Sequence, residues 1–306
     1  MKIGVMGAGA VGCYYGAVLA RAGHAVTLVG RSAMAERVQA IGLRLEMSDR
    51  SCVERVRASD DPALLAGSDI VIFSVKSGDT EEAARAVSRH IGGQSLVLSF
   101  QNGIENAARL HAILHGEVIP AAVYVAAEIV GPGHVKHNGR GDIILGSSSK
   151  SDWVAGVFRD AGIPTVISPD VMGALWSKLI LNCAYNALSA VSQLPYGKIA
   201  QVQGVGDLMA DVIAECLSVA AASGVPVADS IWSDVFALAR AMPNQYSSTA
   251  QDIARKRPTE IDHLNGYIVR KGKELGIKTP SNNALYTMVK LLEAKQVLQA
   301  HDLPTL

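Results

Sequence analysis

Three glycines near the amino terminus constrain the fold more than any other feature of the sequence. Gly7, Gly9 and Gly12 follow the strand-like segment Lys2–Met6 and open a helical pattern. This spacing permits a tight turn, close approach of the backbone to a pyrophosphate, and close packing of the helix on the strand. The helix N-terminus then faces the anion. The spacing predicts a dinucleotide-binding loop, and a plain glycine-rich turn is the alternative. The loop would consist of Gly7, Ala8, Gly9, Ala10, Val11 and Gly12.

The order of the expected elements extends this unit into an α/β domain. Short β-branched runs alternate with helical patterns as far as residue 168. Strands are expected at Lys2–Met6, Ala25–Val29, Ile70–Val75, Ser95–Phe100, Val118–Val125, Val135–Asn138, Ile143–Leu145 and Thr165–Ile167. Helices are expected at Val11–Ala22, Ala33–Ile41, Thr80–Ile91, Asn106–Leu114 and Trp153–Ala161. This alternation predicts a Rossmann-type, doubly wound and mostly parallel sheet with helices on both faces.

Beyond residue 168 the pattern becomes helical. Ser168, Pro169 and Asp170 are typical of an N-cap, a first helical position and a first turn. Helices are expected at about 170–191, 205–223, 229–241, 247–256, 259–275 and 281–296. The sequence therefore predicts two domains, a Rossmann-type domain over residues 1–168 and an all-α domain over residues 169–306.

Composition excludes several classes of partner. The chain has 28 basic and 28 acidic residues, and this balance argues against a nucleic-acid surface. Lys2 and the uncharged stretch 3–20 could be a signal peptide, but the glycines there disfavour one. No other segment offers the ~18 apolar residues that span a membrane. Four widely spaced cysteines indicate reduced thiols and a cytoplasmic protein, and no histidine shows metal-site spacing, so no metal is expected.

The end of the second strand bears on the choice of cofactor. An NAD site places Asp or Glu there to bind the ribose 2′-hydroxyl. This chain has Gly30, which offers no carboxylate, followed by Arg31, whose guanidinium can pair with a phosphate. The pair favours NADP(H), although Arg31 could be an ordinary solvated loop residue.

Two polar residues follow strands at the edge where such sheets bind ligands. Lys76 comes after Ile70–Val75, and Asn102 comes after Ser95–Phe100. Ligands of open α/β sheets bind outside the carboxyl ends of the strands. Either residue could serve only as part of a turn, since Asn102-Gly103 is a common turn pair.

A polar stripe marks the first helix of the second domain. Lys178, Asn182 and Asn186 are each four residues apart and so share one helical line. The rest of this helix is largely apolar, and a buried Lys or Asn is costly unless something polar faces it. The stripe therefore indicates a polar ligand, with a solvated outer face as the alternative.

An acid near the carboxyl terminus is less informative by itself. Glu260 follows Pro258, which suits the first turn of the helix expected over residues 259–275. A carboxylate there is favourable beside the helix dipole. Without further context, Glu260 is more typical of a first-turn acid than of a catalytic group.

These motifs, taken in order, resemble the 2-dehydropantoate 2-reductase (ketopantoate reductase) family over nearly the whole chain. They are the opening glycine loop, Lys76, Gln101-Asn102-Gly103-Ile104-Glu105, Leu175-Trp176-Ser177-Lys178-Leu179 with Asn182 and Asn186, Ser247-Ser248 to Gln251-Asp252, and Thr259-Glu260-Ile261-Asp262 with Asn265-Gly266. The resemblance implies an NADPH-dependent enzyme that reduces ketopantoate to pantoate on the way to pantothenate. It implies a small 2-oxo acid as substrate and a monomer or homodimer.

The resemblance also implies a role for each matching residue. Lys178 matches the proton donor, Asn102 a residue that touches nicotinamide and substrate, and Glu260 one near the cofactor and that lysine. The implied substrate-binding residues are Asn102, Lys178, Asn182, Asn186 and Ser248. The implied cofactor-binding residues are Gly7 to Gly12, Arg31, Lys76, Asn102, Glu260 and Ala127, the last expected just after the fifth strand.

Two positions depart from the family pattern. Tyr196 stands in a turn where the family often has Asn, at a position that reaches the hydroxyl end of the substrate, and Gln245 stands in a segment where an Asn is common. Both leave the identity of the oxo acid open. The alternatives are a related reductase of another 2-oxo acid and a non-catalytic NADP(H)-sensing protein, which would have no need of the stripe.

Overall fold

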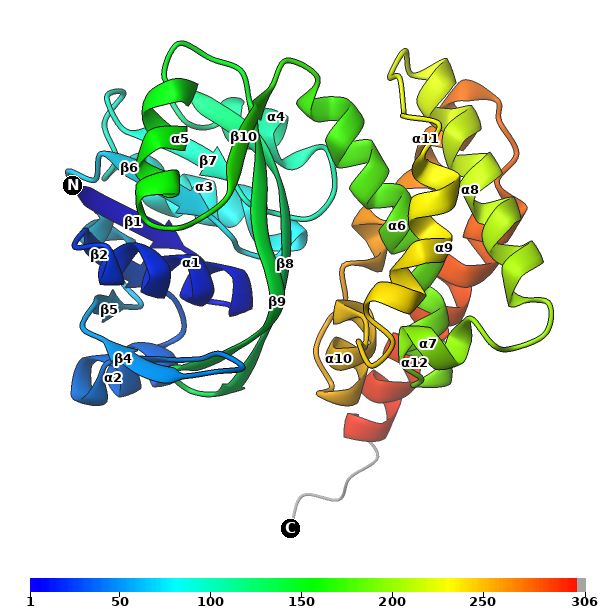
Figure 1. Ribbon diagram of the computed structural model, residues 1–306, viewed down its shortest axis with the longest axis horizontal. Helices are drawn as coiled ribbons and strands as arrows, with labels where there is room; N and C mark the ends of the chain where they lie inside the picture. The colour runs from blue at the N-terminus through cyan, green and yellow to red at the C-terminus, as the bar shows by residue number, and fades with distance from the viewer. Residues whose placement is uncertain (302–306) are drawn as a thin grey trace. The chain divides into compact units, whose positions relative to one another are not determined.

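The computed structural model describes residues 1–301 and falls into two compact units. The first unit comprises Met1–Val171 and the second begins at Met172. Each unit has its own secondary structure, an α/β sheet in the first and helices in the second (Figure 1). Within the described residues, no helix has both the length and the apolar character needed to cross a membrane.

The first unit is built on one sheet whose strand order is β4-β3-β9-β8-β7-β6-β1-β2-β5, with β10 paired to β9. The pairs among β5, β2, β1, β6, β7 and β8 are all parallel. The strands are β1 (Lys2–Met6), β2 (Ala25–Val29), β3 (Leu43–Glu46), β4 (Ser51–Glu54), β5 (Arg57–Ser59), β6 (Ile70–Phe73), β7 (Leu96–Ser99), β8 (Val118–Gly131), β9 (His134–Gly146) and β10 (Thr165–Ser168).

Helices cover both faces of this sheet. They are α1 (Ala10–Arg21), α2 (Ser32–Ile41), α3 (Thr80–Ser88), α4 (Asn106–His111) and α5 (Ser151–Asp160), with 3-10 turns η1 (Pro62–Leu65) and η2 (Ser77–Asp79). Ile70 and Ile72 of β6 pack in one core with α1, α2 and α5. Val71 and Phe73 of the same strand pack in a second core with α3 and α4. The alternation confirms the predicted doubly wound α/β class, because successive strand side chains face opposite sides.

Three strands are missing from the sequence-based prediction. β3, β4 and β5 are short and have charged or exposed residues at alternate positions. They lie toward the two ends of the sheet, where one or both faces meet water. Such strands lack the continuous apolar run that made the central strands recognisable.

The hairpin formed by β8 and β9 is longer than the sequence predicts. β8 does not end at Val125 but continues to Gly131, and the two strands expected at 135–138 and 143–145 are one strand, β9. Gly139, Arg140 and Gly141 have φ of 148°, 58° and 144°. They form an irregularity in the pairing near Val125 instead of ending the strand. These residues lie between the two expected strands and are here part of a β-bulge.

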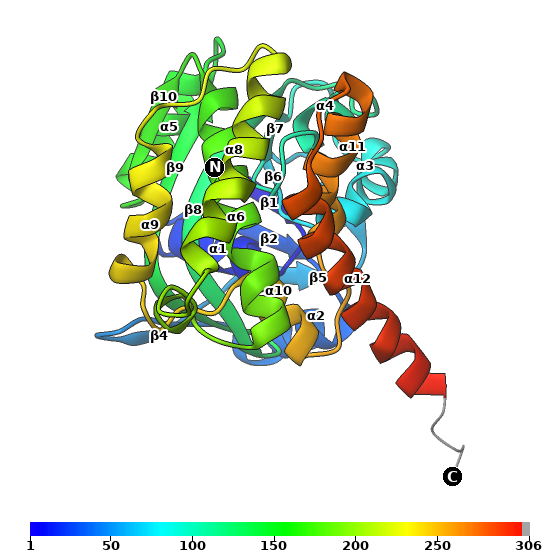
Figure 2. The same cartoon turned by 90° about the vertical axis from the view of Figure 1, so that its right-hand side faces the viewer.

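The second unit is helical over the residues that the structure describes. They are α6 (Val171–Ser192), α7 (Tyr196–Ile199), α8 (Val205–Ala222), α9 (Ile231–Ala241), α10 (Ser248–Ala254), the 3-10 turn η3 (Ile261–His263), α11 (Asn265–Leu275) and α12 (Pro280–His301). α11 and α12 pack side by side (Figure 2).

Of two helix starts predicted in this unit, one is confirmed and one is wrong. The helix expected from about residue 170 is α6, which begins at Val171; Ser168 itself ends β10, and its hydroxyl accepts a hydrogen bond from the Asp170 N–H at 3.1 Å. The helix expected over residues 259–275 is interrupted, because Leu264 has φ −112° and ψ −108°. Glu260 therefore precedes the short turn η3 and is not in the first turn of α11.

Candidate active site

The glycine loop is packed tightly on the first unit's sheet. The N–H groups of Gly7 and Ala8 both donate to Val29 O, at 2.9 and 3.0 Å. Gly7 has φ 108°, and a side chain there would overlap the backbone of Ser74 and Val75. A side chain at Gly12 would overlap Gly7 O and approach Ser74 Oγ to 2.5 Å. Each of these two positions therefore requires glycine for a steric reason.

Gly9 differs from Gly7 and Gly12, because the space that a side chain would occupy there is empty. A Cβ built there meets no atom within 4 Å. The helix α1 begins next to it without a side-chain cap and without an acidic residue in its first turn. Its N-terminal positive charge is thus not neutralised by a carboxylate of that turn. An open backbone at a helix N-terminus fits the pyrophosphate of a dinucleotide.

The end of β2 packs against the same loop. A Cβ at Gly30 would lie 2.6 Å from Ala8 Cβ and 2.6 Å from Met34 Cε. An acidic residue could not occupy this position without displacing the glycine loop. Arg31 follows at the N-cap of α2 and is exposed.

The sequence did not predict that an acidic residue, Asp60, lies near the end of β2. Asp60 Oδ2 accepts a hydrogen bond from Ser32 Oγ at 2.6 Å. Asp60 comes directly after β5, a strand that the sequence pattern did not reveal. A correct prediction of β5 would have placed Asp60 next to the end of β2, because the two strands pair in parallel.

Lys76 and Asn102 lie in two adjoining loops. Lys76 is the N-cap of η2, three residues beyond β6, and Asn102 is three residues beyond β7. Ser77 Oγ donates to Asn102 O at 2.8 Å and so joins the two loops directly. The parallel pairing of β6 and β7 brings both loops to the edge where the glycine loop lies.

Ala127 has a different position from the one expected. It lies within β8, opposite His137 of β9, and does not follow the strand. A pairing irregularity separates it from Ala126. The sequence-based placement ended the strand at Val125 because the bulge disturbs its alternation.

The polar stripe of α6 is only partly open to solvent. Asn186 is 2% exposed, and Lys178 and Asn182 are half-buried. The neighbouring residues Leu179, Ile180 and Cys183 are fully buried. A solvated outer face is therefore the wrong interpretation of Asn186.

The start of α10 is attached to the same part of α6. Ser247 Oγ lies 3.2 Å from Asn186 O, and Ser247 N–H donates to Ser189 Oγ at 3.2 Å. Ser247 Oγ also accepts from Ala250 N–H, which makes it the N-cap of α10. Ser248, the next residue, is exposed. The structure thus brings Asn186 and Ser248 into one region through Ser247, whose role the sequence did not reveal.

The two residues that depart from the family pattern are neighbours. Tyr196 N–H donates to Gln245 O at 2.9 Å. The Tyr196 ring is buried against Tyr185, with ring centroids 4.6 Å apart. The Gln245 side-chain amide donates to Tyr246 O at 2.6 Å. Neither residue provides the pair of amide groups that two asparagines would.

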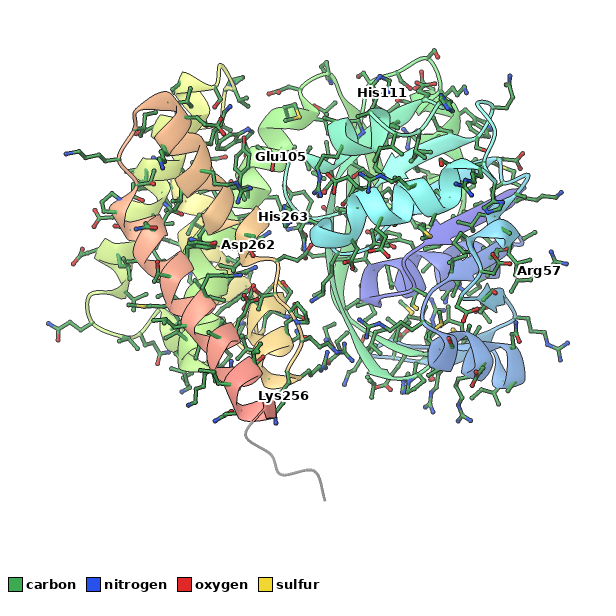
Figure 3. All side chains as sticks on the ribbon, turned by 180° about the vertical axis from the view of Figure 1, so that it is seen from behind. Arg57, Glu105, His111, Lys256, Asp262 and His263 are labelled. Atoms are coloured by element: carbon green, nitrogen blue, oxygen red, sulfur yellow. The ribbon has the colours of Figure 1, made fainter. Side chains whose placement is uncertain are left out.

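Glu260 lies between two anchored residues. Thr259 donates from its N–H and its hydroxyl to Glu293 Oε1 of α12, at 2.8 and 2.7 Å. On the other side, Asp262 accepts from Tyr286 Oη at 2.7 Å and from Lys290 Nζ at 3.0 Å. Figure 3 labels Asp262 and His263 beside α12. Polar contacts with α12, and not a helix of its own, therefore fix the segment that carries Glu260.

Electrostatics in this cluster favour the charged carboxylates. Burial raises the pKa of Glu293, but hydrogen bonds from Lys290 and Thr259 outweigh it, so its pKa lies below the ordinary value. The pKa of Asp262 is lowered in the same way, against burial, by Tyr286 and Lys290. Lys290 also pairs with Glu293 at 2.7 Å, so it links the two carboxylates.

Two of the cysteines, Cys13 and Cys183, are unsuited to act as nucleophiles. All four are free thiols, and Cys13, Cys183 and Cys216 are buried. Burial raises the pKa of Cys13 to about 12 and holds the pKa of Cys183 well above its usual value, so both stay protonated.

Among residues 1–301, no group of three or more His, Cys, Asp or Glu could hold a metal.

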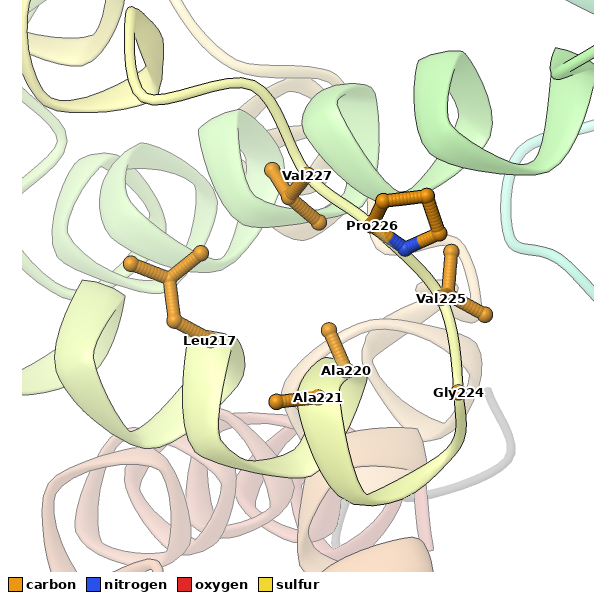
Figure 4. A pocket seen from close by; sticks show the side chains of 7 residues that line it. All are labelled: Leu217, Ala220, Ala221, Gly224, Val225, Pro226 and Val227. Atoms are coloured by element: carbon orange, nitrogen blue, oxygen red, sulfur yellow. The ribbon is translucent and has the colours of Figure 1, made fainter.

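A cavity of about 430 Å³ at the end of α8 is unsuited to this chemistry (Figure 4). Its lining is apolar and carries no titratable side chain. The lining residues are Leu217, Ala220, Ala221, Gly224, Val225, Pro226 and Val227.

Two sequence models of one family cover most of the chain. The model described as ketopantoate reductase PanE/ApbA matches residues 3–150, and the model described as ketopantoate reductase PanE/ApbA C terminal matches residues 170–293. The chain belongs to the ketopantoate reductase family. It is therefore an oxidoreductase that works with a nicotinamide cofactor, as the predicted family implied.

Individual relatives agree with this assignment. The 2-dehydropantoate 2-reductase of Aquifex aeolicus is 34% identical over 318 residues, which cover 99% of both chains. The crystal structure of a PanE/ApbA family ketopantoate reductase from Ralstonia eutropha JMP134 is 51% identical, with a TM-score of 0.94, and the match covers 97% of this chain and 100% of that one. D-mandelate dehydrogenase, solved with NADH and anilino(oxo)acetate, shares the fold with a TM-score of 0.90 and 24% identity over 97% and 100% of the two chains.

Replacing two loop glycines by alanine should separate folding from binding. Gly12→Ala places a methyl against the backbone of Gly7, so it should lower the stability of the first unit by about 1–3 kcal/mol. Gly9→Ala meets open space at φ −83°, so the stability of this variant should not change, while its affinity for the nicotinamide cofactor falls. Thermal unfolding and fluorescence titration measure the two effects. Equal melting temperatures for the two variants would contradict this steric account.

The Glu293–Lys290 pair should make stability depend on pH. A carboxylate whose pKa is lowered by folding stabilises the fold above its unfolded pKa, and this stabilisation is lost as the pH falls through the folded value. We expect Glu293→Gln to lower the melting temperature at pH 7 by about 2–4 °C, and the difference to shrink below about pH 4. Circular dichroism at several pH values checks this. Glu274→Gln, in an exposed pair with Lys271, is the control and should change little at any pH; a pH-independent deficit for Glu293→Gln would refute the linkage.

Proposed function

We propose that this protein catalyses the NADPH-dependent reduction of ketopantoate to pantoate, the step that leads to pantothenate. The observation that carries the proposal is the α6 stripe, where the buried Asn186 lies on one helical line with the half-buried Asn182 and Lys178. Burial of such polar side chains is costly unless they are hydrogen-bonded, and a bound polar substrate would supply hydrogen bonds to them. The names of the curated relatives supply the substrate.

The first unit would hold the cofactor. The residues assigned to it are Gly7 to Gly12, Arg31, Lys76, Asn102 and Ala127, with Glu260 of the second unit. The open backbone at Gly9 and the start of α1 suit a pyrophosphate, and the exposed Arg31 suits a 2′-phosphate. When bound, the reduced nicotinamide supplies a hydride for the C2 carbonyl carbon of the substrate.

The chain's own residues would supply the proton and the orientation. Lys178 holds a proton on its ammonium group and donates it to the C2 oxygen as that oxygen becomes an alkoxide. Its positive charge also stabilises the developing negative charge. Asn182, Asn186 and Ser248 donate hydrogen bonds to the substrate's carboxylate and hydroxyl groups, and so fix the direction of attack.

Two further residues would support this step. Asn102 contacts both substrate and cofactor in this proposal, so its loop sets their mutual position. Glu260 is a carboxylate, and an anion near Lys178 favours the protonated, proton-donating form of the lysine. The anchoring of Thr259 and Asp262 on α12 keeps Glu260 in place.

A second candidate substrate is a 2-oxo acid that lacks the hydroxyl of ketopantoate. The buried ring of Tyr196 favours it, because Tyr196 stands where the family often has Asn at the hydroxyl end of the substrate, and the Gln245 amide is engaged with Tyr246 O. Oxidation of NADPH with ketopantoate and with 3,3-dimethyl-2-oxobutanoate, which differs only by that hydroxyl, distinguishes the two. A site that binds the hydroxyl discriminates strongly against the analogue that lacks it. No turnover with any 2-oxo acid would instead support a cofactor-sensing protein.

Arg31 should determine the preference for NADPH. Arg31→Ala removes a charge-assisted contact to the 2′-phosphate, so NADPH should bind about 10–100-fold more weakly while NADH affinity is unchanged. Fluorescence titration with both cofactors measures this. Arg37→Ala, on the exposed side of the same helix α2, is the matched control. Equal affinity of the parent for NADPH and NADH would refute the assignment.

Lys178→Ala should leave a folded protein that binds NADPH but reacts slowly. Loss of the proton donor should lower kcat by about 10²–10⁴. Steady-state kinetics, with NADPH titration to show that binding is intact, checks this. Lys198→Ala, an exposed lysine of the same unit, should retain the parent's kcat. A kcat within a few-fold of the parent for Lys178→Ala would remove the proposed acid.

A further inference from the structure

Six polar side chains join the loops that follow β6 and β7, and we call them the loop clamp. They come from η2, α3, α4 and the residue after Phe100: Ser77, Thr80, Glu81, Gln101, Asn106 and Arg109. Ser77 and Thr80 are fully buried, and Gln101 and Asn106 are at most 5% exposed. Burying so many polar groups costs free energy unless each is paired.

Asn106 is the centre of the loop clamp. Its Nδ2 donates to Asn102 O at 2.6 Å and to Ser77 Oγ at 3.0 Å. Its Oδ1 lies 2.9 Å from Thr80 Oγ1 and accepts from an Arg109 guanidinium nitrogen at 3.0 Å. All four hydrogen-bonding positions of the amide are therefore occupied.

The loop clamp fixes the main chain of Asn102 from two sides. Asn102 O accepts from Asn106 Nδ2 and, at 2.8 Å, from Ser77 Oγ. Gly103 then turns the chain sharply, with φ 84°. Ser77 and Asn106 therefore fix the main-chain conformation at Asn102. This conformation determines the direction in which the Asn102 side chain points.

Lys76 is held by the same residues. Its neighbour Val75 presents its carbonyl to Gln101 Nε2 at 3.2 Å, and its other neighbour Ser77 presents its carbonyl to Arg109 at 2.7 Å. Arg109 is itself fixed by two hydrogen bonds to Glu81, at 2.8 and 2.7 Å. Movement of one loop would therefore disturb the other.

We propose that Asn106 is a positioning residue of the reduction, which acts by holding Asn102 and Lys76 in one fixed relation. The inference rests on the proposed function, in which Asn102 touches substrate and cofactor. The amino ends of β6 and β7 provide a comparison, because the segments there are also joined but have no proposed role in catalysis. There, a side-chain hydrogen bond from Ser95 Oγ to Ser68 O, at 2.8 Å, joins the segments that precede β6 and β7, beside the main-chain bond from Leu96 N–H to Asp69 O at 3.0 Å.

Asn106→Ala should lower kcat by about 10–100-fold, since small displacements of a residue at the reacting atoms are costly in rate. Ser77→Ala, which removes the other donor to Asn102 O with little loss of volume, should lower kcat less and by the same route. The Ser77→Ala variant also keeps the proposal testable if the Asn106→Ala protein does not fold. Ser95→Ala is the matched control: it should lower the melting temperature but leave kcat unchanged.

A double-mutant cycle with Asn102→Ala tests the route. If Asn106 acts through Asn102, the Asn106→Ala or Ser77→Ala substitution should change kcat less than threefold once Asn102 is already alanine. Full, multiplicative losses in that background would overturn the proposal, as would a lowered melting temperature with an unchanged kcat in the parent background. A parent that reduces no 2-oxo acid would overturn the proposed function and this inference together, whereas an active parent with fully active variants would overturn only the inference.

Discussion

The first unit depends on the contact between the glycine loop and the strands on either side of β1. Val29 O of β2 accepts two N–H groups of the loop, and Ser74 Oγ, just beyond β6, donates to Gly7 O at 2.7 Å. These bonds leave no room for side chains at Gly7, Gly12 or Gly30. The same close packing places the N-terminus of α1 at the edge of the sheet. It also leaves the backbone of Gly9 accessible. Main-chain packing thus determines the conformation of the cofactor loop. Glycine occurs at the positions where a Cβ atom would not fit.

The parts of the fold that the sequence predicted are those with a uniform environment. β1, β2, β6 and β7 are buried on both faces and appear as continuous apolar runs. β3, β4 and β5 could not be found in that way, because half of their residues face water. The β8–β9 bulge changes the direction of side chains within a strand, so alternation around Arg140 fails although pairing continues. Single-residue backbone irregularities of this kind leave little trace in a hydrophobic pattern.

The candidate site was predictable where spacing alone defines a surface. Helical periodicity placed Lys178, Asn182 and Asn186 on one line, and parallel strands placed Lys76 and Asn102 at one edge. The surroundings were not predictable, because they come from distant segments. Ser247 reaches Asn186, and Glu293 reaches Thr259, across 61 and 34 residues of sequence. Asn106 was hidden for another reason: at the start of a short helix, a buried asparagine has the same local pattern as an exposed one.

α12 connects two clusters that share no residue. Near its start, Glu215 of α8 accepts from the N–H groups of Ser281 and Asn282, at 2.8 and 2.9 Å. Farther along, Lys290 and Glu293 hold the segment that contains Glu260. The helix rises about 1.5 Å and turns about 100° per residue, so these clusters are about 12–18 Å apart along its axis and in a fixed rotational phase. A single inserted or deleted residue between Asn282 and Lys290 would turn the lysine to another side. Over evolution, we expect the length of this stretch to be kept even where its exposed residues change.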